Sequence, residues 1–268
     1  MTQIRYKAAV TAAALAGVLL GLPQISRAAQ PYSGNTPAAV GAQDNSVARA
    51  AEAKLNKDRF KSVSVSVDNG IATLKGTVSL YEDKLDAEKR VRGAKGIAAV
   101  RNLIEVGGAA VNDKELQDRL VSKLSYDRVG FGNVFNAISV GVQNGVVTLS
   151  GHARTYVDRD SALALVNTTS GVKDVVNEVE VDPVSIMDDQ TRMQVARAIY
   201  GYASLNRYAM DPAKPIRISV QNGNVELYGV VDSEGDKDTA GLRANSVPGV
   251  FSVKNYLQVA NQPTEARK

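Results

Sequence analysis

The sequence predicts an α+β protein built from three tandem αββαβ units, each with two helices on one face of a three-stranded mixed sheet. Three observations support this fold class: glycines and asparagines that recur at fixed spacing, an Asn-Gly pair between alternating apolar stretches, and apolar residues at helical spacing on both sides. We place the repeats at residues 44–108 (repeat 1), 111–183 (repeat 2) and 186–261 (repeat 3).

The repeated positions are in register without gaps. Corresponding residues differ by 75 between repeats 1 and 2, and by 78 between repeats 2 and 3. Such agreement at four positions in three places is typical of an internal triplication. The fold-defining residues are Gly70, Gly76, Gly96 and Asn102 in repeat 1, Gly145, Gly151, Gly171 and Asn177 in repeat 2, and Gly223, Gly229, Gly249 and Asn255 in repeat 3.

The first 28 residues have the parts of a secretory signal peptide. Arg5 and Lys7 precede an apolar run from Ala8 to Leu22, and small residues precede a cleavage point that we place after Ala28. The alternative is an uncut membrane anchor, although a spanning helix needs roughly 20 apolar residues. Residues 29–43 are rich in Pro, Gly and Ala, and we expect a flexible leader there.

Each repeat then opens with a predicted helix, because apolar residues recur every four positions behind capping residues. The helix anchors are Val47, Ala51 and Leu55 in repeat 1, Leu116, Leu120 and Leu124 (after Asn112 or Asp113) in repeat 2, and Val195 and Ile199 (after Asp188 and Asp189) in repeat 3.

An Asn-Gly pair follows in each repeat and predicts a two-residue type I′ hairpin turn. This turn fixes the register and places an apolar row on one face of the ribbon and a polar row on the other. The glycine of the second strand falls on the core face, where we expect it to let a helix approach closely. The predicted pairs are Val67–Ala72, Val65–Leu74 and Val63–Gly76; Val142–Val147, Val140–Leu149 and Ile138–Gly151; Val220–Val225, Ile218–Leu227 and Ile216–Gly229.

A second helix with acidic residues at its start and a final strand complete each repeat. Acids suit the positive end of the helix dipole. We expect Ala87 and Val91, and their counterparts, to face the core. The last strand should run parallel to the second, with the first strand between them.

Asn102, Asn177 and Asn255 lie in phase with the core residues of the last strand. We expect their amides to bond the backbone of a neighbouring loop, with a ligand contact as the alternative.

These residues resemble a known family. The pattern V-x-V-x-x-G-x-V-x-L-x-G, followed by G-V-x-x-V-x-N, is similar to the BON domain of bacterial periplasmic and outer-membrane proteins, and residues 140–151 and 171–177 fit it best. Repeat 1 departs from the pattern at Ala72 and Ile97, and repeat 3 at Asn224. The resemblance implies attachment to phospholipid surfaces, a role in osmotic-stress protection and no enzymatic activity, but it assigns no ligand residue.

Composition limits the chemistry. The chain has no cysteine and one histidine, which excludes disulfides, thiolate metal sites and a lipid-modified N-terminal cysteine. We therefore expect no catalytic residue, metal or cofactor, and we interpret His152 as a solvated surface imidazole. The acidic string from Asp232 to Asp238 lacks the glycine and glutamate of a calcium-binding EF-hand loop, so helix-start acids explain it better.

Charge also argues against nucleic acid as a partner. Removal of residues 1–28 lowers the formal charge from +4 to +1, and the repeats then carry +3, −3 and 0. The positive charge of repeat 1 gathers on its second helix, where a cationic face could adhere weakly to anionic lipid, although a solvated helix face is the alternative. The candidate cations are Lys84, Lys89, Arg90, Arg92 and Lys95.

Aromatic residues supply the other candidate surface. The chain between the first helix and the first strand is longer in repeats 2 and 3 than in repeat 1. Aromatics there could insert into a lipid interface or anchor a partner protein; alternatively, they seal the small cores or pack one repeat on another. These residues are Tyr126, Phe131, Phe135, Tyr200, Tyr202 and Tyr208.

The sequence therefore predicts a non-enzymatic periplasmic protein, exported but not a lipoprotein. Its predicted partner is a membrane phospholipid surface, in a role in envelope integrity or osmotic-stress protection. The alternative is a protein-interaction or chaperone-like module that binds envelope proteins.

Overall fold

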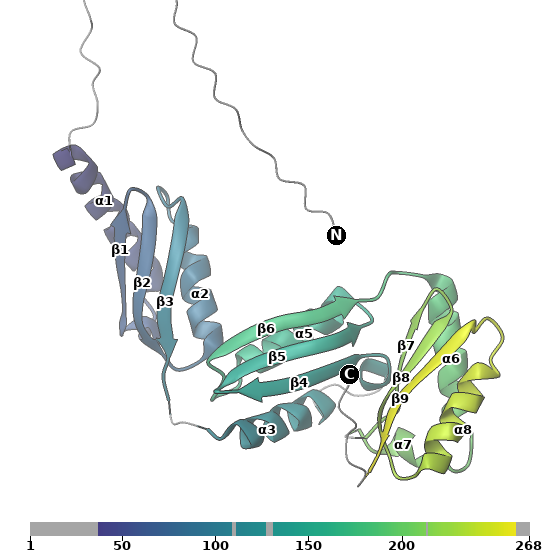
Figure 1. Cartoon of the computed structure of the whole chain (residues 1–268). Coiled ribbons are helices and arrows are strands. Elements are labelled where there is room, and N and C mark those ends of the chain that lie inside the picture. Colours follow the sequence, from purple (N-terminus) through teal and green to yellow (C-terminus); the bar gives the residue numbers. More distant parts are fainter. Residues whose placement is uncertain (1–36, 109–110, 127–130, 213, 261–268) are drawn as a thin grey trace, which may run out of the picture. The chain divides into compact units, whose positions relative to one another are not determined.

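The computed structural model describes residues 37–108, 111–126, 131–212 and 214–260. Within them the chain forms three units of one design, each a three-stranded sheet with two long helices on the same side of it (Figure 1). The predicted α+β fold is confirmed. The predicted signal peptide lies outside the described residues. In the described ranges, no helix combines the length and hydropathy that a membrane crossing requires.

Repeat 1 begins earlier than predicted. Helix α1 starts at Pro37, inside the segment expected to be a flexible leader, so residues 37–43 are helical and that part of the prediction is wrong. Proline is favoured at the first helical position, where its missing N–H costs nothing. The elements of repeat 1 are α1 (Pro37–Glu52), β1 (Val63–Asp68), β2 (Ile71–Val78), α2 (Tyr81–Arg92) and β3 (Ala99–Val106), with short 3-10 helices at Ala53–Leu55 and Asp58–Phe60.

Repeats 2 and 3 keep this order and add one short helix before the first strand. Repeat 2 comprises α3 (Asp113–Tyr126), α4 (Phe131–Val134), β4 (Ala137–Gln143), β5 (Val146–Ala153), α5 (Tyr156–Asn167) and β6 (Asp174–Val181). Repeat 3 comprises α6 (Ile186–Tyr200), α7 (Arg207–Met210), β7 (Arg217–Gln221), β8 (Asn224–Val231), α8 (Glu234–Asn245) and β9 (Ser252–Val259).

The second strand, not the first, is central in every sheet. The strand orders are β1-β2-β3, β4-β5-β6 and β7-β8-β9, with the first pair antiparallel and the second parallel. The parallel pairing was predicted correctly, but the placement of the first strand in the middle was wrong. Elements consecutive in sequence tend to be neighbours in space, and the central strand carries fully buried leucines such as Leu74 and Leu149.

The hairpin registers follow the Asn-Gly rule. Val65 faces Leu74, Val140 faces Leu149 and Ile218 faces Leu227, as predicted. Both turn residues have positive φ in each repeat, for example 50° at Asn69 and 77° at Gly70.

An aspartate of each first helix closes the turn by accepting hydrogen bonds from its backbone N–H groups. Asp113 accepts from Asn144 and Gly145, with a distance of 2.9 Å to the Gly145 nitrogen. Asp188 does the same for Asn222 and Gly223, at 2.9 and 2.8 Å. In repeat 1, Asp44 accepts from the Asn69 N–H at 3.0 Å. The helix and the hairpin are therefore joined inside each repeat.

The repeated glycine of each central strand allows close pairing with the first strand rather than the approach of a helix. Gly151 has φ of 100°, and a Cβ atom there would lie 2.1 Å from the carbonyl oxygen of Ala137, where β4 begins. Gly76 shows the same crowding against the Ser62 carbonyl oxygen, at 1.8 Å. The predicted close approach of a helix belongs instead to the third glycine, because a Cβ at Gly171 would lie 2.9 Å from Val111, next to α3.

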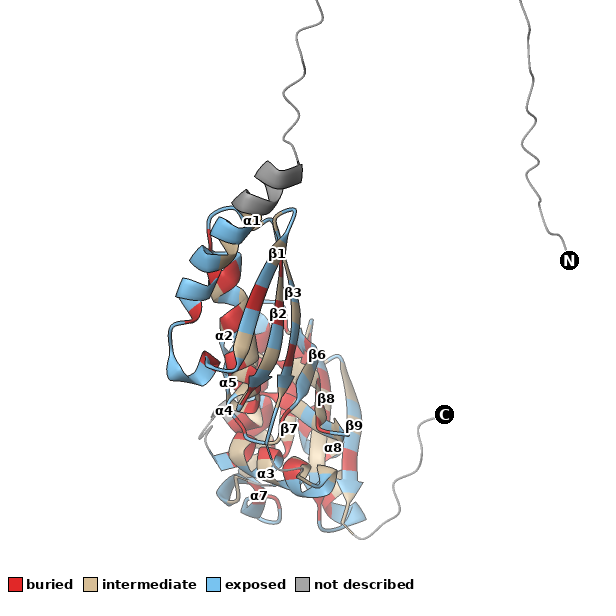
Figure 2. Ribbon diagram, turned by 90° about the vertical axis from the view of Figure 1, so that its left-hand side faces the viewer, coloured by how far each residue is buried: buried red, intermediate tan, exposed pale blue. Residues whose placement is uncertain are grey.

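The core of each repeat lies between its helices and its sheet, where the buried residues of Figure 2 gather. The predicted inner residues of the second helices, Ala87 and Val91 with their counterparts Ala162, Val166, Ala240 and Ala244, are all fully buried. The helix anchors Leu116, Leu120, Val195 and Ile199 are fully buried as well. Apolar periodicity therefore identified the core correctly.

Candidate functional site

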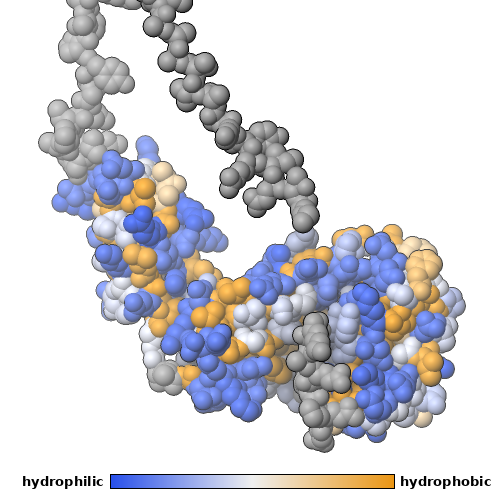
Figure 3. All heavy atoms as spheres, viewed as in Figure 1, coloured by the Kyte–Doolittle hydropathy of each residue, from blue (hydrophilic) through white to orange (hydrophobic). Residues whose placement is uncertain are grey.

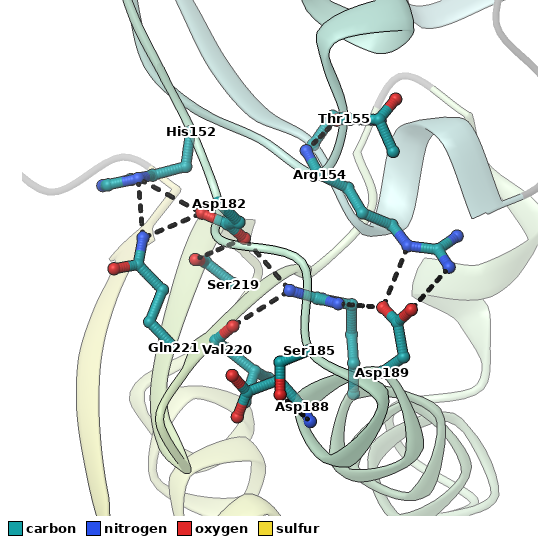
Figure 4. Close-up of polar contacts among 12 residues, drawn as sticks. His152, Arg154, Thr155, Asp182, Ser185, Asp188, Asp189, Ser219, Val220 and Gln221 are labelled. Carbon is teal, nitrogen blue, oxygen red and sulfur yellow. Dashed lines mark hydrogen bonds and ion pairs between the residues drawn. The ribbon is translucent and has the colours of Figure 1, made fainter.

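A cluster of polar side chains lies where repeat 2 meets repeat 3 (Figure 4), and we call it the joint network. At its centre, Arg192 of α6 lies with a nitrogen 3.0 Å from a carboxylate oxygen of Asp182, and both side chains are almost completely buried. The same nitrogen donates to the Val220 carbonyl oxygen at 2.9 Å. The Asp182 backbone N–H donates to Ala153 of β5, which ties this carboxylate to repeat 2. The joint network comprises His152, Arg154, Asp182, Asp189, Arg192, Ser219 and Gln221.

A second ion pair lies beside the first. The Arg154 guanidinium donates through two nitrogens to the two carboxylate oxygens of Asp189, each at 3.1 Å. Arg154 thereby holds the pKa of the Asp189 carboxyl below its usual range, and Arg192 adds to the effect. A bidentate arginine–carboxylate pair fixes orientation as well as distance, so α6 is held in a defined position against the start of α5.

His152 belongs to this network, so its predicted role as a solvated surface residue is wrong. Its side chain is 21% exposed, and Nδ1 lies 3.5 Å from a carboxylate oxygen of Asp182. The Gln221 amide lies 3.3 Å from the same nitrogen and donates to Asp182 at 2.8 Å. The Asp182 carboxylate raises the pKa of His152 by favouring the charged imidazolium.

The joint network has the character of a structural connection. Its carboxylates are engaged by arginine, serine, glutamine and histidine groups. In the part of the chain that the structure describes, no three His, Asp or Glu side chains are grouped so that they could hold a metal ion.

The aromatic candidates divide into buried and exposed residues. Phe135 precedes β4 of repeat 2 yet packs in the core of repeat 3, with Arg154 and Arg192 each 6.0 Å from its ring. The Tyr200 hydroxyl donates to the Ile216 carbonyl oxygen at 2.6 Å, and burial raises the pKa of this phenol. The Tyr208 hydroxyl donates to Asp236 at 3.0 Å. Phe135 and Tyr208 are buried, and Tyr200 is partly buried against the core of repeat 3.

Tyr126 and Tyr202 are exposed at the surface. Tyr202 lies under the Arg243 guanidinium at 5.4 Å. Phe131 begins α4, but its side chain is outside the described residues.

Asp236, from the acidic string of repeat 3, accepts a hydrogen bond from the Ser233 hydroxyl at 2.9 Å and lies in the first turn of α8. This is the predicted helix-start arrangement.

The basic candidates form an exposed face only in part. Arg90 pairs with Asp86 at 2.8 Å, and Arg92 pairs with Glu88. Lys89, Arg92 and Lys95 are exposed, whereas Lys84 and Arg90 are partly buried. The outer surface of α2 therefore combines cations with the exposed side chain of Leu85.

The repeated asparagines bond the backbone, and in repeats 1 and 3 they join the last strand to the second helix. The Asn102 amide donates to the Lys84 carbonyl oxygen at 3.0 Å, and the Asn255 amide donates to Lys237 at 2.7 Å. Asn177 accepts from the Val179 N–H at 3.2 Å. The predicted backbone bonding is present, but in repeats 1 and 3 the acceptor lies in a helix rather than in a loop.

A tyrosine joins repeat 1 to repeat 2. Tyr81 begins α2, is 9% exposed, and packs in the core cluster of repeat 2 together with Val106. Its phenol is hydrogen-bonded to the Asp174 carboxylate and to the backbone of Val175. Burial and Asp174 raise the pKa of Tyr81 to about 12.

Sequence reasoning missed both junctions. Asp182 follows the last strand of repeat 2 without a motif of its own, and Arg192 lies among the apolar anchors of α6, where one charged residue has no distinctive spacing. The position of Arg192 between Asp188 and Val195 could have indicated the junction, because it places the arginine on the helix face that the apolar anchors predict to be buried. A charge there needs a buried partner.

Comparison with known proteins identifies the repeated unit. The BON domain matches the chain three times, over residues 43–108, 112–183 and 191–261. The chain belongs to the BON-domain family. This confirms the resemblance noted in the sequence.

The individual proteins that resemble this chain share less than a third of its residues. The chain is 28% identical over 132 residues to osmotically-inducible protein Y of Escherichia coli K12. That match covers 45% of this chain and 61% of the relative's length. Two structures of CdsD, described as a structural protein of the type III secretion system of Chlamydia trachomatis, align over 79% of this chain. They are 17% and 18% identical, with TM-scores of 0.23 and 0.24, and 90% and 96% of their own lengths are covered.

Proposed function

We propose that this BON protein is a non-enzymatic, osmotic-stress-related protein of the bacterial envelope that adheres to anionic phospholipid surfaces through repeat 1. The similarity to an osmotically inducible protein supports the physiological role. The predicted signal peptide supports a periplasmic location, because its sequence has the charged, apolar and small-residue parts of an export signal.

The observation that carries the lipid proposal is the outer face of α2. Lys89 and Arg92 follow Leu85 at helical spacing and are exposed with it, and Lys95 lies just beyond the helix. The corresponding second helices of repeats 2 and 3 have Ala164 and Leu242 in place of Lys89, and Asn167 and Asn245 in place of Arg92. Each cation near an anionic membrane contributes about 1 kcal/mol, so such a face gives weak adhesion that salt reverses.

Co-sedimentation with phosphatidylglycerol vesicles tests this function. We expect the chain starting at Ala29 to bind at low salt and to dissociate at high salt. Substitution of Lys89 and Lys95 by alanine should weaken binding about thirtyfold, because two membrane-facing charges of about 1 kcal/mol each are lost. The control removes two exposed lysines of repeat 2, Lys114 and Lys173. Absence of low-salt binding, or an equal loss in both double variants, would refute the lipid function.

A protein-interaction role is the second candidate, and one observation favours it. In repeat 3 the open face of the sheet contacts repeat 2 through Ser219 and Gln221, so such a face can bind a folded unit. The corresponding face of repeat 1 leaves Leu103 and Ile71 exposed, and hydrophobic and hydrophilic residues are interspersed on the side shown in Figure 3. Capture of envelope proteins by the wild type, lost in Leu103→Lys and kept in Leu242→Lys, would support this role over lipid binding.

A further inference from the structure

The tyrosine junction between repeats 1 and 2 has a counterpart in repeat 2 that no described residue covers. The offset of 75 relates Tyr81 to Tyr156, and both begin the second helix of their repeat. Tyr81 is 9% exposed, whereas Tyr156 is 65% exposed and the adjacent Val157 is 77% exposed. The Arg159 guanidinium lies 5.0 Å from the Tyr156 ring but leaves most of it accessible.

Repeat 3 does not cover Tyr156, because the joint network holds repeat 3 against Arg154 and Asp182 of repeat 2 instead. Arg154 and Asp182 bind residues of α6 and β7. In a second junction like the first, Tyr156 would instead meet the start of β9, since the offset of 78 relates Asp174 and Val175 to Ser252 and Val253. The chain therefore contains a tyrosine equivalent to Tyr81 and a strand start equivalent to that of β6, but these two groups are not joined to each other.

The corresponding end of repeat 3 has the chemistry to receive Tyr156. Phe251, just before β9, is 81% exposed, and its ring lies against the backbone of Gly223 in the hairpin turn. Asp188 binds the same turn, so the start of α6 lies at this end with exposed Ile186 and Met187. Ser252 corresponds in sequence to Asp174 of the first junction; its hydroxyl donates to the Asn224 side-chain oxygen at 2.7 Å and can accept a hydrogen bond from a phenol.

We propose that Tyr156 and Val157 of one molecule dock on the Phe251 end of repeat 3 in a second copy of this chain. The contact reproduces between molecules the junction that joins repeats 1 and 2 within one. The equivalent end of repeat 1 offers only Ala98 and Ala99 at the positions of Phe251 and Ser252, so repeat 3 is the better receptor. Large exposed apolar groups are typical of protein contact sites, and reciprocal docking of two molecules gives a closed dimer.

Sedimentation velocity over a range of concentrations tests the association with the chain starting at Ala29. We expect the sedimentation coefficient to rise with concentration in the wild type. Val157→Asp and Phe251→Asp should each weaken the association at least tenfold, while Leu242→Asp, an equally exposed change on α8, should not alter it. A monomer at all concentrations, or equal effects of the three variants, would overturn the proposal.

Cross-linking identifies the faces in contact. Because the chain has no cysteine, each single-cysteine variant has one reactive thiol. We expect Tyr156→Cys and Phe251→Cys, mixed and oxidised, to form a disulfide-linked heterodimer in preference to a mixture of Tyr156→Cys with Leu242→Cys. Equal yields would overturn the proposed contact even if the chain self-associates. Vesicle binding through repeat 1 is independent of these residues, so its failure and that of the self-association are distinguishable.

Discussion

Asp182 shows how one carboxylate can connect groups that are distant in sequence. It binds Arg192 and Gln221, and it lies beside the imidazole of His152. These partners come from repeat 3 and from the β5 strand of repeat 2. A buried carboxylate is tolerated because each oxygen has hydrogen-bond donors, and its loss would leave the buried Arg192 guanidinium with Asp189 as its remaining ion-pair partner.

The contact between His152 and Asp182 predicts a pH-dependent contribution to stability. Asp182 raises the folded-state pKa of His152 above its usual value of 6.5, and Glu180 and Glu226 add to the effect. The imidazolium is therefore favoured by folding. Its contribution is fully present below the unfolded-state pKa and is lost as the pH rises through the folded-state pKa.

Urea unfolding of the wild type and of His152→Gln at pH 5.5 and pH 8 checks this linkage. We expect the wild type to gain free energy of unfolding relative to the variant at pH 5.5, and to lose that gain at pH 8. The chain has one histidine, so no other imidazole contributes to the difference. A difference that is constant with pH, or larger at pH 8, would contradict the assigned contact.

Among the elements, the central strand of each sheet depends on a glycine for its fit to the neighbouring strand. Gly151 combines positive φ with a backbone oxygen where a Cβ atom would lie. Gly141, on β4 of the same sheet, has no atom within 4 Å of its virtual Cβ and no positive φ. The two positions offer a direct comparison of a required and a dispensable glycine.

Gly151→Ala is therefore expected to lower the free energy of unfolding by about 2 kcal/mol or more, because the new methyl group overlaps the Ala137 carbonyl and φ is strained. Gly141→Ala should change it by no more than about 0.5 kcal/mol. Chemical denaturation monitored by far-UV circular dichroism provides the measurement. Comparable losses in the two variants would show that Gly151 is not constrained in this way.

The elements were predictable where local rules determine them. The Asn-Gly turns fix the pairing of Val65 with Leu74 through φ values that asparagine and glycine tolerate, and apolar spacing placed Leu116 and Leu120 inside. Strand order was not predictable in the same way, because a parallel strand can join either edge of a hairpin without changing the apolar pattern. The role of Gly151 was misread since sequence shows that space is needed but not which group fills it.

In the whole molecule, the two junctions between repeats differ in kind. Repeat 1 meets repeat 2 through the buried phenol of Tyr81, whereas repeat 2 meets repeat 3 through ion pairs and the ring of Phe135. The residues at these junctions, and therefore the surfaces left exposed, were only partly predictable from the sequence. Phe135 and Tyr208 were identified as unusual aromatics, but whether an aromatic packs inside or remains at the surface depends on contacts that repetition alone does not reveal.

The joint network predicts that repeats 2 and 3 unfold together. Arg192→Ala leaves Asp182 buried without its main partner, which costs about 3 to 5 kcal/mol, and it should separate the unfolding transitions of the two repeats. Arg197→Ala, an exposed arginine on the same helix, should leave stability within about 0.5 kcal/mol of the wild type.

Differential scanning calorimetry, with residue-resolved hydrogen exchange to assign each transition, measures this coupling. We expect a shared transition for repeats 2 and 3 in the wild type and in Arg197→Ala. Independent transitions in the wild type, or an unchanged profile in Arg192→Ala, would show that the two repeats are not coupled through this contact.

The aspartate that closes each Asn-Gly turn comes from the helix of the same repeat. A copied segment therefore brings its own turn-closing group and can fold wherever the gene places it. Later substitutions, such as Arg192 in α6, then determine which neighbour it meets. Growth by duplication, followed by divergence at the ends, accounts for three units that share the spacing of their glycines yet are joined by two unlike junctions.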